Sequence, residues 1–215
     1  MTNINSGVWK AIDSDAAIKR ALLEGLINTS ALARKLAADN GWQDNIDAVI
    51  SAIRRYEGSS TQKDYLKAVY KLLKEAKLST KTKLVAVLLK KNADIRKRLA
   101  SLYAQIEFEA GETLRIFEVT KYIKLIIDER TMPRLNELIN QKDIVEVIKG
   151  IGELSIDYTV DITKTPGLFA ALSNELAINE VSIVDSMICH REHIIIVRVE
   201  DIEQAFRIIL KLTHG

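Results

Sequence analysis

The sequence predicts an α+β protein in which an all-helical N-terminal part precedes two similar repeats of strands and helices. Apolar residues recur at helical spacing up to about residue 58, between short polar or glycine-containing breaks. Residues 80–150 and 151–215 then show the same succession of strand, helix, two-stranded hairpin and helix. Because a β-α-β-β-α-β order is typical of ferredoxin-like modules, we expect two such modules after the helical domain.

Three short helices are predicted between residues 13 and 57. Residues 13–15, 28–30 and 44–45 supply Asp, Asn, Ser or Thr at the N-caps, where a side-chain oxygen accepts from first-turn N–H groups. The third helix should bury one face, because four apolar residues follow at i, i+3, i+4 and i+7: Ile46, Val49, Ile50 and Ile53. We therefore assign residues 1–58 to one helical domain.

Three helices of this length suggest a helix-turn-helix unit. In that interpretation the third helix enters the major groove of DNA, with three polar residues on its open face: Ser51, Arg54 and Arg55. A packing module without a DNA role is the alternative. The link of residues 39–44 exceeds the usual three or four residues of a tight helix-turn-helix, and Asp47 would repel phosphates.

Residues 59–79 are expected to form a linker and a basic amphipathic helix. Gly58-Ser59-Ser60 is the linker, and the helix turns Lys63, Lys67, Lys71 and Lys74 outward. Residues 51–100 contain 14 Lys or Arg against 4 Asp or Glu, although the whole chain has a formal net charge of only +2. Such a basic segment could follow a phosphate backbone, with Lys63 and Lys67 as contacts, or it could pack between domains with its lysines merely hydrated.

The elements of the two repeats follow from apolar runs and capping residues. In the first repeat we expect strands at 84–89, 113–119, 122–127 and 144–148, and helices at 92–105 and 131–139. In the second we expect strands at 154–162, 181–189 and 194–199, and helices from 165 to about 177 and from 201 onward.

Thr165-Pro166-Gly167 opens the first helix of the second repeat. Thr is a favourable N-cap and Pro is tolerated at the first helical position, where its missing N–H removes no hydrogen bond. Gly167 would allow a small anion to approach the first-turn N–H groups, which carry partial positive charge. The carboxylate of a free amino acid would suit this site. The other interpretation is that Pro166-Gly167 is only a tight turn into a helix.

These residues resemble the ACT-domain family, and the likeness is greatest to the tandem ACT regulatory region of aspartokinases. The residues that resemble it are Thr165-Pro166-Gly167, Ile178–Ile183 and Val199–Ala205, in that order. The resemblance implies an amino-acid site at a domain interface, formed by the turn before the helix and the start of the next strand: Thr165, Pro166, Gly167, Asn179, Val181 and Ser182. Glu180 departs from the more neutral residue of the family. In the first repeat Lys91-Asn92-Ala93 replaces the turn and lacks the glycine.

Two hypotheses of function follow. In the first, the protein is a transcriptional regulator in which amino-acid binding at an ACT dimer interface changes the spacing of two DNA-binding helical domains. In the second, it is a free-standing ACT regulatory subunit that binds an amino-acid biosynthetic enzyme such as an aspartokinase. Both require an unpaired sheet edge or helix face to be covered, so we expect a homodimer or a higher homo-oligomer.

Several classes of protein are not expected. The sequence has no phosphate-binding loop, GxSxG elbow or HExxH helix, and the predicted modules leave no room for a kinase domain, so we expect no enzyme and no cofactor. Cys189, His190 and His193 lack a fourth ligand, so no metal site is predicted. With a single cysteine, no signal peptide and no apolar run long enough to span a bilayer, a cytoplasmic protein without membrane partners is expected.

Overall fold

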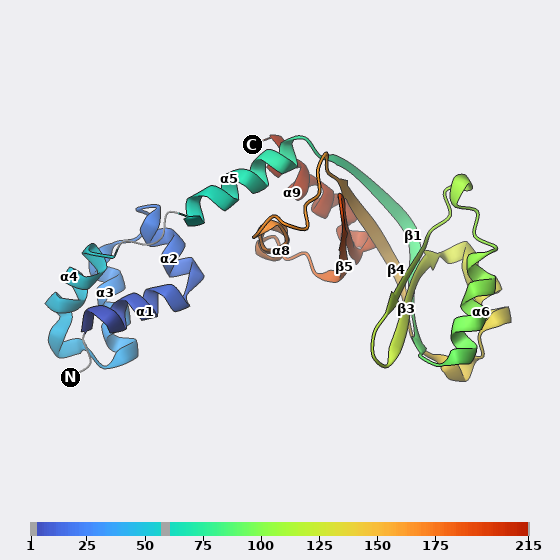
Figure 1. Ribbon diagram of the computed structural model, residues 1–215, viewed down its shortest axis with the longest axis horizontal. Helices are drawn as coiled ribbons and strands as arrows, with labels where there is room; N and C mark the ends of the chain where they lie inside the picture. Colours follow the sequence, from blue (N-terminus) through green and yellow to red (C-terminus); the bar gives the residue numbers. More distant parts are fainter. Residues whose placement is uncertain (1–3, 57–60, 215) are drawn as a thin grey trace. The chain divides into compact units, whose positions relative to one another are not determined.

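The computed structural model describes residues 4–56 and 61–214, and the predicted linker Gly58–Ser60 lies outside them. The chain forms two compact units, Met1–Asp64 and Tyr65–Gly215 (Figure 1).

The first unit contains α1 (Ile4–Ser14), α2 (Ala16–Leu23), α3 (Thr29–Asn40) and α4 (Ile46–Arg54). Two of the predicted N-caps are confirmed, because Asp15 Oδ1 accepts from the N–H groups of Ala17 and Ile18 and Asn28 Oδ1 accepts from Ala31 N. Helix α1 was not expected from the sequence. It packs against α3 and α4 through buried apolar residues: Val8, Ile12, Leu32, Leu36, Val49 and Ile53.

The second unit is built on one antiparallel sheet with the strand order β2-β3-β1-β4-β6-β5. Its strands are β1 (Lys77–Lys90), β2 (Leu114–Glu118), β3 (Tyr122–Asp128), β4 (Ile144–Asp157), β5 (Ile183–Cys189) and β6 (Glu192–Arg198). The long strands β1 and β4 pair along their whole length and so belong to both halves of the sheet. Short 3-10 turns occur at Gln43–Asn45, Phe108–Ala110, Glu129–Thr131, Gln141–Asp143 and Val199–Asp201.

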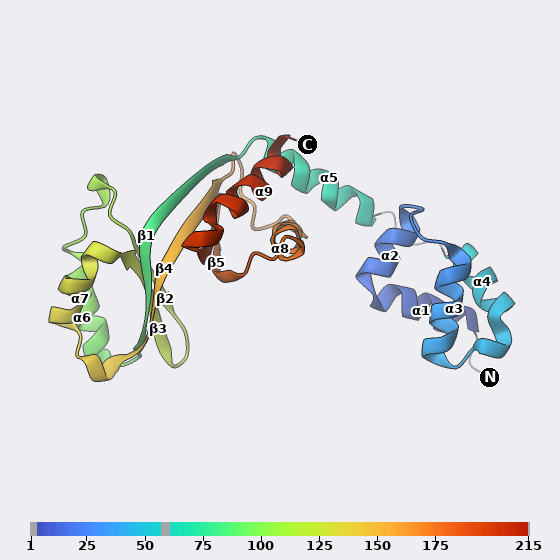
Figure 2. The same ribbon diagram turned by 180° about the vertical axis from the view of Figure 1, so that it is seen from behind.

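Helices cover the outer face of this sheet. The half made by β2, β3 and the adjoining parts of β1 and β4 carries α6 (Ala93–Tyr103) and α7 (Met132–Leu138). The half made by β4, β5, β6 and the start of β1 carries α8 (Leu168–Ile178) and α9 (Ile202–His214) (Figures 1 and 2). We call these the first half and the second half.

The inner face of the sheet is packed against itself, because the sheet curls. Six buried residues from four strands form a separate apolar cluster on this face: Leu84, Ala86, Ile126, Ile151, Ile194 and Ile196. An ion pair from β3 to β5, between Lys124 Nζ and Asp185 Oδ2 at 2.7 Å, joins the two halves beside this cluster. The two halves therefore share an inner core as well as two strands.

Irregular backbone occurs where the sheet passes from one half to the other. The pairing of β1 with β4 shifts register between Lys81 and Leu84, and Lys83 and Gly150 have positive φ angles of 60° and 65°. Gly152 is needed for close packing, since a Cβ there would lie 3.2 Å from the Ile202 side chain and 3.3 Å from Lys81 O. Bulges of this kind increase strand twist, which is consistent with the curled sheet.

The structure corrects several predicted strands. β1 begins at Lys77 instead of Leu84, and β4 runs without a break through the boundary predicted at residues 150 and 151. Lys77–Lys81 pairs only with β4 and supplies the second half with its fourth strand. That strand precedes the first half in the sequence, so the second half does not have the predicted β-α-β-β-α-β order along the chain.

Helix α5 (Thr61–Lys74) packs on the second half. Val69 and Leu73 are fully buried in the cluster that contains α8 and α9, whereas Lys67, Lys71 and Lys74 are exposed. The helix therefore packs on the second half through its apolar face, and contact of its lysines with a phosphate backbone stays a prediction.

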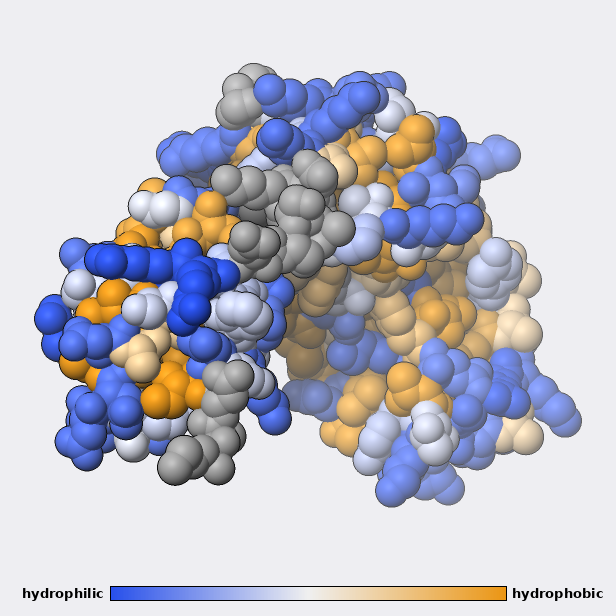
Figure 3. Space-filling model, turned by 60° about the vertical axis from the view of Figure 1, so that its left-hand side comes forward, coloured by the Kyte–Doolittle hydropathy of each residue, from blue (hydrophilic) through white to orange (hydrophobic). Residues whose placement is uncertain are grey.

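Large apolar side chains also remain at the surface, among them Tyr103, Phe108, Ile178 and Phe169. Figure 3 shows one face of the molecule, on which hydrophobic areas are interspersed with hydrophilic ones. No helix within the described ranges has both the length and the apolar character that a membrane crossing requires.

Candidate ligand-binding site at the start of helix α8

The segment that leads from β4 to α8 is fastened to the β5–β6 hairpin. Tyr158 N donates to Arg191 O at 2.8 Å, and Ile162 N donates to His190 O at 2.9 Å. Asp161 Oδ1 accepts from both the N–H and the hydroxyl of Thr163, at 2.9 and 2.7 Å, and these two bonds hold the pKa of Asp161 below its usual value. The turn before α8 is therefore fixed by main-chain and side-chain hydrogen bonds.

The helix starts later than predicted. Gly167, with φ 80° and ψ −5°, occupies the N-cap position, and the first helical residue is Leu168. This left-handed conformation is accessible to glycine at little cost and interrupts the helix, so Thr165 and Pro166 precede the helix instead of opening it. Gly167 O still accepts the first helical bond, from Ala171 N at 2.8 Å.

No side chain caps α8. In the described part of the chain, the N–H groups of Leu168, Phe169 and Ala170 have no hydrogen-bond acceptor. The equivalent helix of the first half differs, because Asn92 Oδ1 accepts from Ile95 N at 2.8 Å and so closes the start of α6. Uncapped N–H groups at a helix start favour an anion.

A hollow of about 490 Å³ lies beside this turn. Two of the predicted ligand-binding residues, Thr165 and Gly167, line it, whereas Pro166 does not. Phe169 and Ile188, which also line it, are 48% and 40% exposed. The hollow thus combines backbone N–H groups with an apolar rim.

The other three predicted residues lie at the opposite end of α8, which is about 16 Å long. Asn179 is the C-cap of α8, and its Nδ2 donates to Glu175 O at 2.8 Å. Val181 is a core residue with 4% exposure, and Ser182 is exposed. Within one chain the structure does not bring Asn179, Val181 and Ser182 to the turn at 165–167, because the whole helix separates them.

His193 lies behind the hollow and was not predicted as part of the site. Its side chain is fully buried, its ring centroid is 5.9 Å from that of Phe169, and its Nε2 lies 2.9 Å from Ser186 Oγ. It is also paired across the hairpin with Ile188. Alternation in β6 places His193 on the same face as Ile195 and Val197, so the sequence contained a signal for its burial.

Cys189 and His190 do not converge with His193. The first two are exposed at the hairpin, whereas His193 is buried beneath α8. In the described ranges, no three His, Cys, Asp or Glu side chains are grouped as a metal site would need.

The residues predicted to bind DNA lie in two places. Ser51 and Arg54 are exposed on α4, and Arg55 is held by hydrogen bonds to Asn5 Oδ1 at 3.1 Å and to Ser51 O at 3.2 Å. Lys67 is exposed on α5. The side chain of Lys63 lies outside the described part of the structure.

No protein-family model and no curated protein matches the sequence. Solved structures do match. The aspartate kinase of Clostridium acetobutylicum has a TM-score of 0.52 and 16% identity over 63% of this chain, which spans 34% of that enzyme. The regulatory subunit of aspartate kinase from Thermus thermophilus, in its ligand-free form, has a TM-score of 0.51 and 15% identity, over 63% of this chain and 95% of that one.

A third match is a Vibrio cholerae protein of unknown function, described as a possible transport protein, with a TM-score of 0.50 and 16% identity. The match covers 70% of this chain and 99% of the Vibrio cholerae protein. At such low identities the likeness concerns the fold alone. The α+β part of this chain has an ACT-like fold, of the kind found in the regulatory regions of aspartate kinases.

Proposed function

We propose that this protein is a non-catalytic, amino-acid-sensing regulatory protein, and specifically a free-standing ACT regulatory subunit that binds an amino-acid biosynthetic enzyme such as an aspartokinase. The likeness to a Thermus regulatory subunit over 95% of that chain supports this function over that of a transcriptional regulator. The comparisons give no support for DNA binding. On α4, the exposed Arg54 alone does not indicate a DNA-binding surface, because Arg55 is held by hydrogen bonds within the helical unit.

The observation that carries the proposal is the uncapped start of α8. Leu168, Phe169 and Ala170 line a hollow of about 490 Å³, and their N–H groups have no acceptor among the described residues. An amino-acid carboxylate could accept from them, and Gly167 leaves the backbone accessible. The capped start of α6 argues that the ligand binds in the second half and not in the first.

In this proposal each half of the sheet corresponds to one ACT-type module, and two copies of the chain form the ligand site together. Asn179, Val181 and Ser182 can then contribute only from a second copy, because within one chain α8 separates them from Thr165 and Gly167. A side chain of the ligand would contact Phe169 and Ile188, whose exposed apolar surfaces a second copy would also help to cover.

The proposal is tested by measuring the melting temperature of the full-length protein with each of the twenty L-amino acids. A ligand that binds only the folded state raises the melting temperature. We expect at least one amino acid whose effect on the melting temperature is lost in Gly167→Val, because a branched side chain at φ 80° is strained and blocks the N–H groups. Gly41→Val is the matched control, since Gly41 has φ 72° at the end of α3, which belongs to the other compact unit.

The responding amino acid should then alter the activity of an aspartate kinase only when this protein is added, and the Gly167→Val variant should have no such effect. If no amino acid raises the melting temperature of the wild-type protein, the sensing role is wrong. If one does but the enzyme is unaffected, the sensor remains and the partner is a different protein.

A further inference from the structure

We infer that the inner face of the curled sheet holds a second, separate binding site, for a free amino acid or another small zwitterion. The site is a cavity of about 750 Å³ at the end of the second half, between β1, β2, β4 and the β5–β6 hairpin. This volume is within the range of roughly 300–1,000 Å³ typical of small-molecule pockets. It lies on the face of the sheet opposite to α8 and does not depend on the function proposed above.

The floor of the cavity follows from strand register. Glu153, Ser155 and Asp157 alternate along β4 and share the inner face. Ser79 of β1 is paired with Ser155, and Glu192 of β6 is paired with Asp157. Beyond the apolar inner cluster the floor is therefore polar, with the hydroxyls of Ser79 and Ser155 and the carboxylates of Glu153, Asp157 and Glu192.

One cation of the site is Arg115, which reaches across from β2 of the first half; Lys81 and Arg191 also line the cavity. Its Nη2 lies 3.0 Å from Glu153 Oε1 and its Nε 3.3 Å from Oε2. The Glu153 side chain is only 4% exposed, and its Oε1 also accepts from Ser155 Oγ at 3.0 Å. Glu153 thus orients the guanidinium, whose Nη1 has no acceptor among the described residues and remains available to a carboxylate.

The anions of the site are Asp157 and Glu192. They are cross-strand partners, and neither has an ion-pair partner in the described part of the chain. Like charges directly opposite one another destabilise a sheet. Asp157 is also opposite Lys77 of β1, but no ion pair joins these two side chains among the described residues, so a ligand ammonium between Asp157 and Glu192 would relieve their repulsion. Glu192 also interacts electrostatically with Arg115, which places the cation and the anions around one space.

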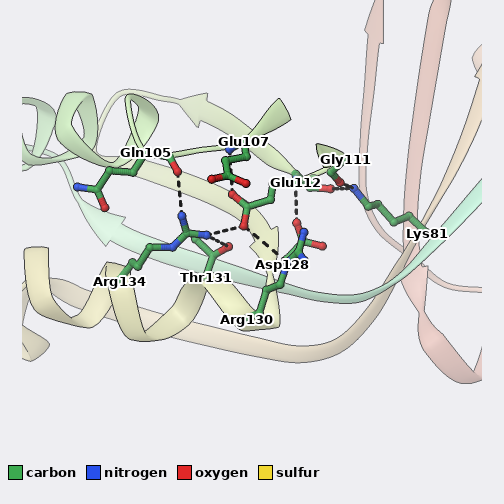
Figure 4. A network of polar contacts seen from close by, with 10 residues as sticks. Lys81, Gln105, Glu107, Gly111, Glu112, Asp128, Arg130, Thr131 and Arg134 are labelled. Atoms are coloured by element: carbon green, nitrogen blue, oxygen red, sulfur yellow. Dashed lines mark hydrogen bonds and ion pairs between the residues drawn. The ribbon is translucent and has the colours of Figure 1, made fainter. Parts of the chain in front are cut away.

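One wall of the cavity is held rigidly. Lys81 Nζ donates to Gly111 O and to Thr113 Oγ1, which ties the loop at Gly111 to β1 (Figure 4). Next to it, Glu112 accepts from Arg134 Nη2 at 2.6 Å and from Glu107 N at 3.0 Å. A wall fixed in this way needs little ordering when a ligand binds.

The arrangement favours a zwitterion over a simple ion. A plain anion at Arg115 would meet the unpaired carboxylates of Asp157 and Glu192, and a plain cation would meet the guanidinium. A molecule with a carboxylate beside an ammonium satisfies both groups at once. Because Arg115 comes from the first half and the carboxylates from the second, such a ligand would also link the two halves.

The test is calorimetric titration of the full-length protein with each of the twenty L-amino acids. We expect an amino acid that binds the Gly167→Val variant and whose affinity falls at least ten-fold in the Asp157→Asn, Glu192→Gln double variant, because charge-assisted hydrogen bonds are lost. Both replaced residues are exposed, so folding should be preserved. The control is Glu137→Gln with Glu200→Gln, which removes the same charge from exposed carboxylates outside the cavity.

The stoichiometry gives a second measure that needs no change at Gly167, because the double variant should bind one equivalent per chain fewer than the wild-type protein. Binding that Gly167→Val abolishes and the double variant leaves intact would support the α8 site and overturn the inner-face site. Binding that the double variant abolishes and Gly167→Val leaves intact would support the inner-face site and contradict the α8 site. Absence of binding in the wild-type protein would overturn both.

Discussion

His193 illustrates how a single buried residue links the fold to solution conditions. Its side chain is fully buried in the second half. Nε2 has a hydrogen-bond partner, Ser186 Oγ, whereas Nδ1 has none among the described residues. Burial disfavours the charged imidazolium and lowers the pKa of His193 from its usual 6.5 to about 4. The residue is therefore neutral in the folded protein at physiological pH.

This pKa predicts a pH-dependent stability. Between pH 6.5 and 4 the unfolded chain holds a proton on His193 that the folded chain does not, so falling pH favours unfolding across this window. Above pH 6.5 His193 is neutral in both states, so it does not lower the free energy of unfolding there. In urea titrations, the free energy of unfolding should fall by about 2 kcal/mol between pH 7 and pH 5 because of this residue.

The His193→Gln variant, whose amide does not titrate, should lose this part of the pH dependence. An unchanged slope in the variant would assign the acid sensitivity to other groups. The exposed His190, changed to Gln, is the matched control and should leave the slope as it is.

Caps could be predicted residue by residue, because each depends on a few neighbouring residues. The caps predicted at residues 13–15, 28–30 and 92–94 are confirmed, since Asp15, Asn28 and Asn92 each accept from a first-turn N–H. The cap predicted at residues 44–45 is wrong, because Asn45 precedes α4 but its side chain makes no capping hydrogen bond. Thr165 was read wrongly. The standard preference for Thr before Pro was overridden by Gly167, whose positive φ angle cannot be read from the order of residue types alone.

At the scale of elements, the ion pair between Arg115 on β2 and Glu153 on β4 should contribute more to stability than the surface pairs. Arg115→Met leaves the buried Glu153 carboxylate without its cation. We expect a loss of about 2–3 kcal/mol in urea unfolding, below the 3–5 of a fully buried pair because the Arg115 side chain is 34% exposed.

Adding Glu153→Met to Arg115→Met should recover part of the loss, since no uncompensated charge remains. The exposed pair Glu203–Arg207 on α9 is the control, and Arg207→Met should change stability little. If Arg115→Met were as mild as Arg207→Met, Glu153 would have to be satisfied by other groups.

The type of most elements could be predicted from the sequence, and their extent was harder to predict. The apolar part of β1 was recognised at residues 84–89, but Lys77–Lys83 is polar and mostly exposed, so it carries no strand pattern. In β4, the repeated order of elements predicted a domain boundary between residues 150 and 151, but the strand continues through it. There Gly150 has a positive φ angle, and Gly152 allows the close approach of Ile202, from a helix distant in sequence.

At the scale of the whole molecule, the shared strands predict that the two halves do not fold separately. A fragment of residues 80–150 lacks the part of β4 beyond 150, and a fragment of 151–215 lacks the strand Lys77–Lys81. Circular dichroism and urea unfolding should show no cooperative transition for either fragment. Residues 65–215, which form one compact unit, should unfold cooperatively.

A cooperative transition in the 151–215 fragment would contradict this dependence.

The same long-range pairing limited what could be predicted of the ligand site. The turn at 165–167 was found because it is local, whereas the position of Asn179 and Val181 depends on where α8 ends, and the inner-face cavity depends on how the sheet curls.

The pairing of Lys77–Lys81 with Glu153–Asp157 also has a consequence for synthesis. When a ribosome makes this chain, α5 and the start of β1 emerge well before their partners in β4, α8 and α9. Val69 and Leu73 must then stay without their core until Ala205 and Ile209 have been added. The nascent chain is therefore exposed to aggregation or chaperone binding until α9 has left the exit tunnel.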